Sequence, residues 1–150
     1  MLLSDYVIEP ANWLDLAALQ RLEKVCFDVD AWSILDLIGV LSLPEFIRLK
    51  ASVEGQMAGF VAAEQRRNET KAWIVTIGVF PQYRRAGIAR ALLQACEEQI
   101  ELPVVRLCVR RSNLSAQNLY ENTGYTRVDT WRHYYHSGED ALVYEKILHP

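Results

Sequence analysis

A short segment that combines three arginines with several small residues is the part of this sequence best suited to bind an anion. It begins at Arg84 and reads Arg-Arg-Ala-Gly-Ile-Ala, with Arg90 following directly. The segment separates an expected strand from an expected helix, and the start of a helix leaves backbone N–H groups without partners within the helix. Small residues such as Ala86 and Gly87 allow a phosphate to approach those N–H groups. The nucleotide-binding patterns GxGxxG and GK[ST] are absent, so the sequence predicts a different diphosphate-like ligand.

The elements that must position this segment follow from hydrophobic periodicity. Ala72 to Phe80 is rich in Ile, Val and Thr, which predicts a strand, and apolar residues recur at helical spacing after Gly87. Val104 to Val109 predicts the next strand, and a strand–helix–strand unit requires a parallel pair. The other expected elements are a strand at 6–8, helices beginning near Asn12 and after Ser33, strands at 46–53 and 57–65, a helix at 115–123, and strands at 125–135 and 141–147. This order predicts an α/β fold with a mixed sheet of about seven strands and about four helices.

Length, charge and cysteine content limit the classes of protein to which the chain can belong. With 150 residues, 51% of them apolar, we expect one domain spanning residues 1–150. The formal net charge of -3 argues against a dedicated nucleic-acid binder, although a local basic patch remains possible. The three cysteines share no CxxC spacing, and the apolar stretch from Ile34 to Leu43 is too short to span a bilayer. We therefore expect a soluble, cytoplasmic protein, either a monomer or a homodimer, with no membrane partner.

The segment at 84–89 resembles the R/Q-x-x-G-x-G/A signature of the GCN5-related N-acetyltransferase (GNAT) superfamily. The similarity extends through 107–113, 116–125, Tyr134-Tyr135 and 139–141, where the sequence resembles ribosomal-protein alanine N-acetyltransferases and related protein N-terminal acetyltransferases. The resemblance implies the GNAT fold, with a splayed pair of parallel strands. It also implies direct transfer of acetyl from acetyl-coenzyme A to a primary amine, above all a protein N-terminal α-amine. A small-molecule amine acceptor, or a non-catalytic module that binds acyl-coenzyme A, fits the cofactor-binding half equally well.

The same resemblance implies which residues hold the coenzyme. The backbone of two strand residues would pair with the pantetheine amides, the segment at 84–90 would hold the pyrophosphate, and two asparagines would line the pantetheine arm. Tyr120 would lie beside the thioester sulfur, where a phenol with a pKa of about 10 can donate a proton to the departing thiolate. A core tyrosine with its hydroxyl tied down is the other interpretation of Tyr120. The implied cofactor-binding set is Ile77, Val79, Arg84, Arg85, Ala86, Gly87, Ile88, Ala89, Arg90, Asn113, Asn118 and Tyr120.

One position departs from the family pattern and leaves the general base open. The ribosomal-protein branch has a glutamate where this chain has Cys108, so the glutamate's role cannot be carried over. A cysteine on a half-buried strand usually behaves as a small apolar residue, although a thiolate base is conceivable. Glu64, near the end of an expected strand, is the nearest candidate carboxylate, and a solvated surface charge is its alternative interpretation. Water or a backbone carbonyl would also serve as the base.

Several aromatic residues are candidates for binding the acceptor. The resemblance implies that the pair Tyr134-Tyr135 borders the substrate groove, and strand alternation allows only one of the two to face it unless the strand is bulged or has ended. Trp32 would mark the opposite wall, and Trp73 lies on the strand beside the cofactor. The predicted acceptor-binding set is therefore Trp32, Trp73, Cys108, Tyr134 and Tyr135. His133 and His136 lack further ligands at metal-binding spacing, so no metal is expected.

Overall fold

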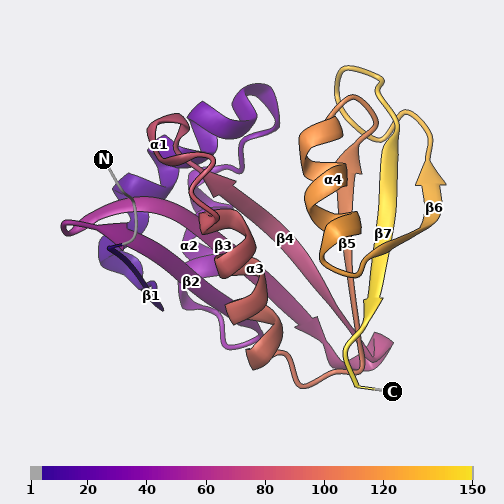
Figure 1. The fold of residues 1–150 in the computed structure, drawn as a ribbon, viewed down its shortest axis with the longest axis horizontal. Helices are drawn as coiled ribbons and strands as arrows, with labels where there is room; N and C mark the ends of the chain where they lie inside the picture. The colour runs from indigo at the N-terminus through magenta and orange to yellow at the C-terminus, as the bar shows by residue number, and fades with distance from the viewer. Residues whose placement is uncertain (1–4, 150) are drawn as a thin grey trace.

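The computed structural model describes residues 5–149 and contains a seven-stranded mixed sheet with helices on both faces (Figure 1). The strands are β1 (Tyr6–Pro10), β2 (Phe46–Val53), β3 (Gln56–Arg66), β4 (Lys71–Val79), β5 (Val104–Arg110), β6 (Thr126–Trp131) and β7 (Ala141–Ile147), and the helices are α1 (Leu16–Phe27), α2 (Ile34–Ser42), α3 (Ile88–Gln99) and α4 (Leu114–Asn122). The sheet order is β1-β2-β3-β4-β5-β7-β6. The expected fold class and element order are confirmed. None of the helices within residues 5–149 is long and apolar enough to cross a membrane.

Local sequence explains where the helices begin. The side chain of Ser33 accepts a hydrogen bond from Asp36 N at the start of α2, and the side chain of Asn113 accepts one from Ala116 N at the start of α4. Such side chains satisfy N–H groups that the first helical turn leaves unpaired. Gly87 precedes α3 in the left-handed conformation, with φ of 80°, which a residue with a Cβ adopts only at a cost.

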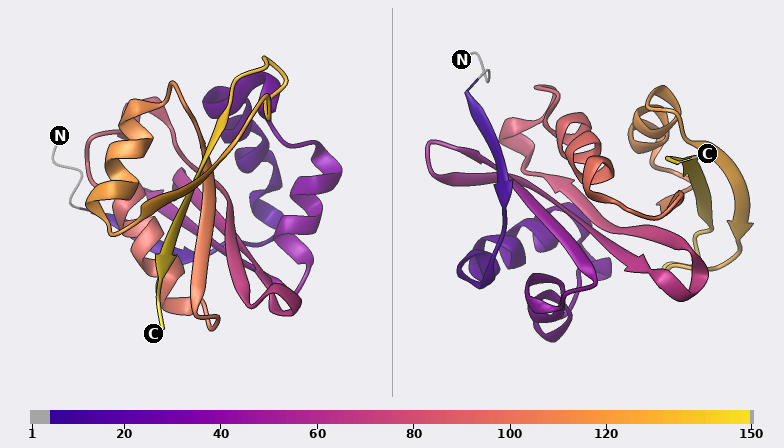
Figure 2. Two further views of the ribbon diagram at one scale, coloured as in Figure 1. Left: turned by 90° about the vertical axis from the view of Figure 1, so that its right-hand side faces the viewer. Right: turned by 90° about the horizontal axis from the view of Figure 1, so that it is seen from below.

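Two apolar clusters cover the two faces of the sheet. One contains Ile88, Leu92 and Cys96 of α3 together with β-strand residues and Tyr120 of α4. The other contains Leu19 and Leu22 of α1, residues of α2, and the opposite face of β3. Figure 2 shows α1 and α2 on one side of the sheet and α3 and α4 on the other. The loop at 84–90 and the α1–α2 loop therefore approach the sheet from opposite sides.

The parallel strands β4 and β5 pair only over a short distance. Their register runs from Lys71 opposite Val104 to Trp73 opposite Arg106, and beyond Trp73 the strands separate (Figure 1). The register between β3 and β4 also shifts at Ala62 and Ala63, where Val75 is the extra residue of β4. A bulge of this kind bends its strand and adds to the separation. The predicted splayed pair is confirmed, and we call the opening between β4 and β5 the fork.

The strand expected at 125–135 is wrong beyond Trp131, where β6 ends. His133 has a left-handed backbone conformation, with φ of 53°, which is incompatible with continuing a strand. Two backbone hydrogen bonds, from Tyr135 N to Glu139 O and from Gly138 N to Tyr135 O, close the following segment as a loop. Tyr134 and Tyr135 therefore belong to the β6–β7 loop and are free of strand alternation.

Candidate active site

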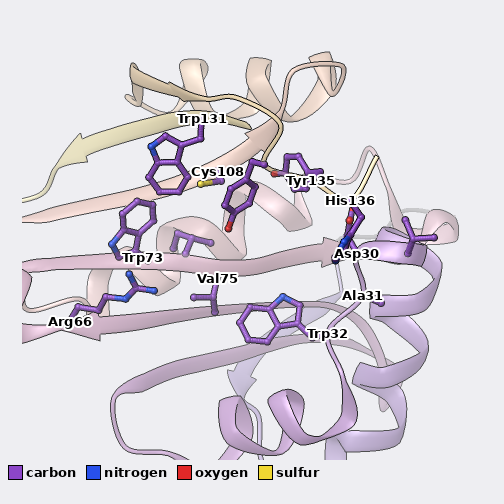
Figure 3. Close-up of a pocket in the computed structure, with 13 residues that line it drawn as sticks. Asp30, Ala31, Trp32, Arg66, Trp73, Val75, Cys108, Trp131, Tyr135 and His136 are labelled. Atoms are coloured by element: carbon purple, nitrogen blue, oxygen red, sulfur yellow. The ribbon is translucent and has the colours of Figure 1, made fainter. Parts of the chain in front are cut away.

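Two connected cavities occupy the fork. The first, which we call the fork cavity, has a volume of about 320 Å³ and reaches from Cys26 on α1 to Asn113 and Tyr120 at α4. The second, which we call the aromatic pocket, has a volume of about 690 Å³ and lies on the α1–α2 side (Figure 3). Both are lined by Val29, Asp30, Trp32, Ile74, Val75, Cys108 and Tyr135. Two ligands that enter from opposite faces of the sheet would therefore meet within the fork.

The loop before α3 leaves its backbone N–H groups accessible. A Cβ at Gly87 would meet no atom within 4 Å, and no side chain caps the first turn of α3. Two of the arginines use their side chains to hold the protein together: Arg84 Nε donates to Val79 O at 3.0 Å, and Arg90 donates to Asn122 O at 3.1 Å. An anion at this loop would therefore be held mainly by backbone N–H groups and the helix dipole.

The predicted cofactor-arm residues lie at different distances from the fork. Ile77 and Asn113 line the fork cavity. Val79 is buried, and its carbonyl already accepts from Arg84 and, at 3.5 Å, from Cys26 Sγ, so its N–H is the more available group for an extended ligand. Asn118 is exposed on α4 and lines neither cavity.

Tyr120 is both a core tyrosine and a residue of the fork cavity, the two interpretations that its sequence context allowed. It is 5% exposed and packs against Tyr125 and Tyr144, with ring centroids 5.8 and 6.2 Å away, yet it also lines the fork cavity. Burial raises the pKa of the Tyr120 phenol above its ordinary value of about 10. The phenol is therefore protonated at neutral pH and available as a proton donor inside the cavity.

The three cysteines are neutral thiols at neutral pH. Burial raises the pKa of Cys108, between the two cavities, to about 11, and that of Cys96 to about 12. Burial also raises the pKa of Cys26, although its hydrogen bond with Arg84 acts in the opposite direction. None of these thiols has the lowered pKa that activates a cysteine nucleophile or base.

Glu64 lies at the edge of the aromatic pocket and does not line it. On β3 it is directly opposite Trp73 of β4, so the two side chains share a face of the sheet. Its carboxylate accepts a hydrogen bond from Arg66 Nε, and Arg66 is the residue of this pair that lines the pocket. Glu64 instead lines a separate hollow that includes Pro44 and Asn68.

All of the aromatic residues predicted to bind the acceptor lie around the aromatic pocket. Tyr134 and Tyr135 both line it, because β6 ends at Trp131 and the two residues belong to the loop that follows. Trp32 lines the opposite wall, where its backbone N–H donates to Glu23 Oε1 at 3.2 Å. Trp73 lies at the point where β4 and β5 separate.

Sequence reasoning missed four residues of this region: Asp30, Arg66, Arg110 and Trp131. Asp30 lines both cavities and forms an ion pair with Arg110, which also binds Glu139 at 2.8 Å. This arginine thereby joins the α1–α2 loop to the β6–β7 loop. Asp30 lies two residues before Trp32, and the resemblance to the family included Trp32, so that resemblance could have pointed to Asp30. Trp131 carried no sequence signal that distinguished it from an ordinary aromatic residue of a strand.

No group of three or more His, Cys, Asp or Glu side chains within residues 5–149 is arranged to hold a metal ion. His133 Nδ1 is 3.0 Å from Gly138 O and helps to close the β6–β7 loop. His136 instead lines the aromatic pocket.

Comparison with known proteins agrees with this geometry. The model of the acetyltransferase (GNAT) family matches residues 13–125. The chain is 36% identical over 141 residues to the N-terminal acetyltransferase A complex catalytic subunit NAA10 of Arabidopsis thaliana, covering 89% of this chain and 73% of that protein. It is 32% identical over 104 residues to the [ribosomal protein bS18]-alanine N-acetyltransferase of Escherichia coli K12, covering 65% of this chain and 69% of that protein. The crystal structure of the ribosomal-protein-S18-alanine N-acetyltransferase from Escherichia coli superposes with a TM-score of 0.86 at 26% identity, covering 97% of this chain and 96% of that one. With its fork, its glycine-containing loop before α3 and these similarities, this chain belongs to the acetyltransferase (GNAT) family.

Proposed function

We propose that this protein transfers an acetyl group from acetyl-coenzyme A to the α-amine at a protein N-terminus, with both substrates bound at once. The observation that carries the proposal is the shared lining of the fork cavity and the aromatic pocket, because it allows an amine on one face of the sheet to meet a thioester on the other. The relatives named above, an N-terminal acetyltransferase subunit and a ribosomal-protein alanine N-acetyltransferase, support the choice of acceptor. The neutral thiols of Cys26 and Cys108 favour direct transfer over an acetyl-cysteine enzyme.

The residues present fit acetyl-coenzyme A, which supplies the acetyl group as a thioester. The backbone of Arg85 to Arg90 would hold the pyrophosphate, since the left-handed Gly87 leaves open space in front of the first turn of α3. Ile77 and Val79 lie on the edge of β4 that the fork leaves unpaired with β5, so their backbone would bind the pantetheine arm as an added strand would. Asn113 would line the arm, and Asn118 would contact it only at the surface.

The reaction moves the acetyl group from sulfur to nitrogen, so a proton must leave the acceptor amine and another must reach the sulfur. Tyr120 is placed to donate the second proton, because its phenol lines the fork cavity and is protonated at neutral pH. Loss of the first proton is easy for an α-amine, because about a tenth of it is already neutral at pH 7, compared with about 0.04% of a lysine side chain. An N-terminal acceptor therefore tolerates a weak base.

Two carboxylates compete for the role of base. Glu64 would have to release Arg66 and act through water from the edge of the pocket, whereas Asp30 lines both cavities but is paired with Arg110. If Glu64 takes the proton, Glu64→Gln lowers kcat/KM most at low pH, and the loss shrinks above the α-amine pKa of about 8. Asp30→Asn is the matched variant, and the same pH-dependent loss in that variant alone would assign the base to Asp30.

A polyamine acceptor is the second candidate, and the charges around the pocket disfavour it. Among the described residues that line the aromatic pocket, Asp30 is the one carboxylate, and Arg110 neutralises it. A ligand with several ammonium groups needs several unpaired carboxylates to replace its hydration.

A release assay for free coenzyme A thiol, with an unblocked peptide, lysine and spermidine as acceptors, tests the proposal. Thiol release with the peptide and with neither other acceptor supports the proposed function. Release at the buffer rate with every acceptor would indicate a non-catalytic module that binds acyl-coenzyme A.

We extend the proposal to a cytoplasmic location. Cys26, Cys96 and Cys108 are all free thiols, and cysteines persist in the reduced form mainly in reducing compartments.

A further inference from the structure

Four aromatic side chains form a continuous row along one side of the aromatic pocket. Ring centroids are 5.7 Å apart between Trp73 and Trp131, 5.5 Å between Trp131 and Tyr134, and 5.1 Å between Tyr134 and Tyr135. We call these four residues the aromatic wall. It begins on β4, where the fork opens, and crosses to the β6–β7 loop, so that it passes over Cys108 on β5 (Figure 3).

Charged and polar groups hold the wall in place. Arg66 lies over the Trp73 ring at 5.4 Å and Arg110 over the Tyr135 ring at 4.2 Å, so a guanidinium stacks at each end. The indole N–H of Trp131 donates to Asp129 Oδ2 at 3.1 Å, which fixes the orientation of that ring. The wall is therefore a preorganised surface, and a ligand would lose little side-chain entropy by using it.

The wall extends beyond the place where the acetyl group is transferred. Tyr135 lines both cavities, but Trp73, Trp131 and Tyr134 line only the aromatic pocket. An extended peptide advances about 3.3–3.6 Å per residue. A peptide whose amine lies beside Tyr135 would therefore bring its second or third residue to Tyr134 and Trp131.

The far end of the wall offers a hydrogen-bond donor without a partner. Trp73 Nε1 is the one buried side-chain polar atom in the described part of the chain that has no hydrogen-bond partner, and Figure 3 shows it turned toward Arg66. A buried N–H without an acceptor is unfavourable, so this corner favours an oxygen atom of a ligand. No carboxylate is found among the described residues that line the aromatic pocket without also lining the fork cavity, namely Ala31, Arg66, Trp73, Trp131, Tyr134 and His136. Outside this lining, Glu64 and, at 3.5 Å, Glu69 pair with Arg66, so its charge is already compensated.

We propose that Trp73, Trp131 and Tyr134 form a specificity subsite for a large apolar side chain, aromatic above all, at the second or third residue of the acceptor peptide. A peptide carbonyl accepts a hydrogen bond at the corner between Trp73 and Arg66. The proposal rests on the proposed function, since it takes the aromatic pocket to be the acceptor site. Apolar burial against fixed rings supplies the preference.

The test is kcat/KM for a matched set of unblocked hexapeptides that begin with alanine and differ only at position two or three, where each carries Phe, Ala or Lys. At one of these positions the wild-type protein should use the Phe peptide about tenfold better than the Ala peptide, and the Lys peptide no better than the Ala peptide. In the Trp131→Ala variant the ratio of Phe to Ala should fall below about twofold.

Trp13→Ala is the matched control, because Trp13 is 73% exposed and lines neither cavity, and its ratios should equal those of the wild type. If Trp131→Ala does not fold, Tyr134→Leu at a 54% exposed position serves the same purpose. Equal use of all the peptides by the wild type, a preference for lysine, or a Phe preference that survives these substitutions would overturn the subsite. If no peptide is acetylated while acetyl-coenzyme A still binds, the proposed function itself fails and the subsite fails with it.

Discussion

The hydroxyl of Thr76 donates a hydrogen bond of 2.6 Å to the carboxyl of Glu23, which joins β4 to α1 beneath the acceptor side of the fork. Glu23 is 1% exposed, and its second oxygen accepts from the backbone N–H of Trp32. One buried carboxyl thus connects the strand that lines the fork cavity to the loop that forms a wall of the aromatic pocket. Glu23 is a positioning residue, because it acts on the acceptor site through Trp32 and Thr76.

Removal of the Glu23 carboxyl should impair acceptor binding more than coenzyme binding. Glu23→Ala frees the α1–α2 loop, so we expect the KM for an acceptor peptide to rise about tenfold, whereas the KM for acetyl-coenzyme A changes less than about threefold. Glu23→Gln retains an acceptor oxygen and should restore most of the loss. Leu19→Ala, a buried position of α1 outside both cavities, should lower Tm without shifting the ratio of the two KM values.

The pH dependence of stability gives a second measurement on the same carboxyl. Burial raises the pKa of Glu23, so the folded protein favours its protonated form. Its stabilising contribution is complete below the unfolded pKa of about 4.3 and is lost as pH rises through the higher folded pKa. The Tm of Glu23→Gln minus the Tm of the wild type should therefore increase as the pH rises from 4.5 to 8. A constant difference would mean that the carboxyl titrates alike in both states.

Cys108 should be dispensable as a titrating group. Because burial raises its pKa to about 11, the thiol is protonated throughout the range in which the acceptor amine titrates. Cys108→Ala should keep the pH profile of kcat/KM, with its inflection near the amine pKa of about 8. Cys108→Glu should lower activity, because the new carboxylate would be half-buried beneath the aromatic wall without a partner. A gain in activity from Cys108→Glu would show that the site lacks only its base.

The loop before α3 can be tested with two glycines in the same backbone conformation. Gly87 has φ of 80° and Gly55 has φ of 77°, and a Cβ at either would meet nothing within 4 Å. Gly87→Glu and Gly55→Glu should therefore carry similar strain. Only Gly87→Glu should weaken coenzyme A binding measured by calorimetry, by at least tenfold, because its carboxylate opposes the phosphates. Equal affinities in the two variants would remove the loop from the coenzyme site.

Variants of two neighbouring tyrosines, Tyr120 and Tyr125, distinguish the loss of the proposed proton donor from the loss of a structural hydroxyl. Tyr120→Phe keeps the ring packing but removes the phenolic proton from the fork cavity, so kcat should fall about 10²-fold with little change in coenzyme affinity. Tyr125 donates to Glu97 at 2.7 Å and does not line the fork cavity. Tyr125→Phe should lower Tm and leave kcat close to the wild-type value. Equal kcat for Tyr120→Phe and the wild type would exclude the proton-donor role.

Features encoded by neighbouring residues were predictable from the sequence. The strand–loop–helix unit around Gly87 follows from strand periodicity, the small residues and the apolar spacing of α3, all within about 30 residues. The fork was implied by the resemblance to the GNAT superfamily, and the short pairing of β4 with β5 realises it.

Contacts between distant segments were not predictable in this way. Asp30 and Arg110 are 80 positions apart, and Trp73 meets Trp131 although β5 and β7 lie between their strands. These contacts depend on how strongly the sheet curves and on where β6 ends. The end of β6 was missed because aromatic residues that favour strands, Tyr134 and Tyr135, follow Trp131, whereas the left-handed backbone at His133 stops the strand. The pairing of Glu64 with Arg66 is likewise a choice of side-chain conformation that residue spacing does not decide.

The most direct measurement of the central claim is mass spectrometry of two peptides incubated with the protein and acetyl-coenzyme A. Both contain one internal lysine, and they differ only in that the α-amine of the second is blocked. We expect one acetyl group on the α-amine of the unblocked peptide, none on either lysine, and none on the blocked peptide. Acetylation of the lysine in the blocked peptide at the same rate, or no acetylation of either peptide by protein that binds acetyl-coenzyme A, would contradict the account.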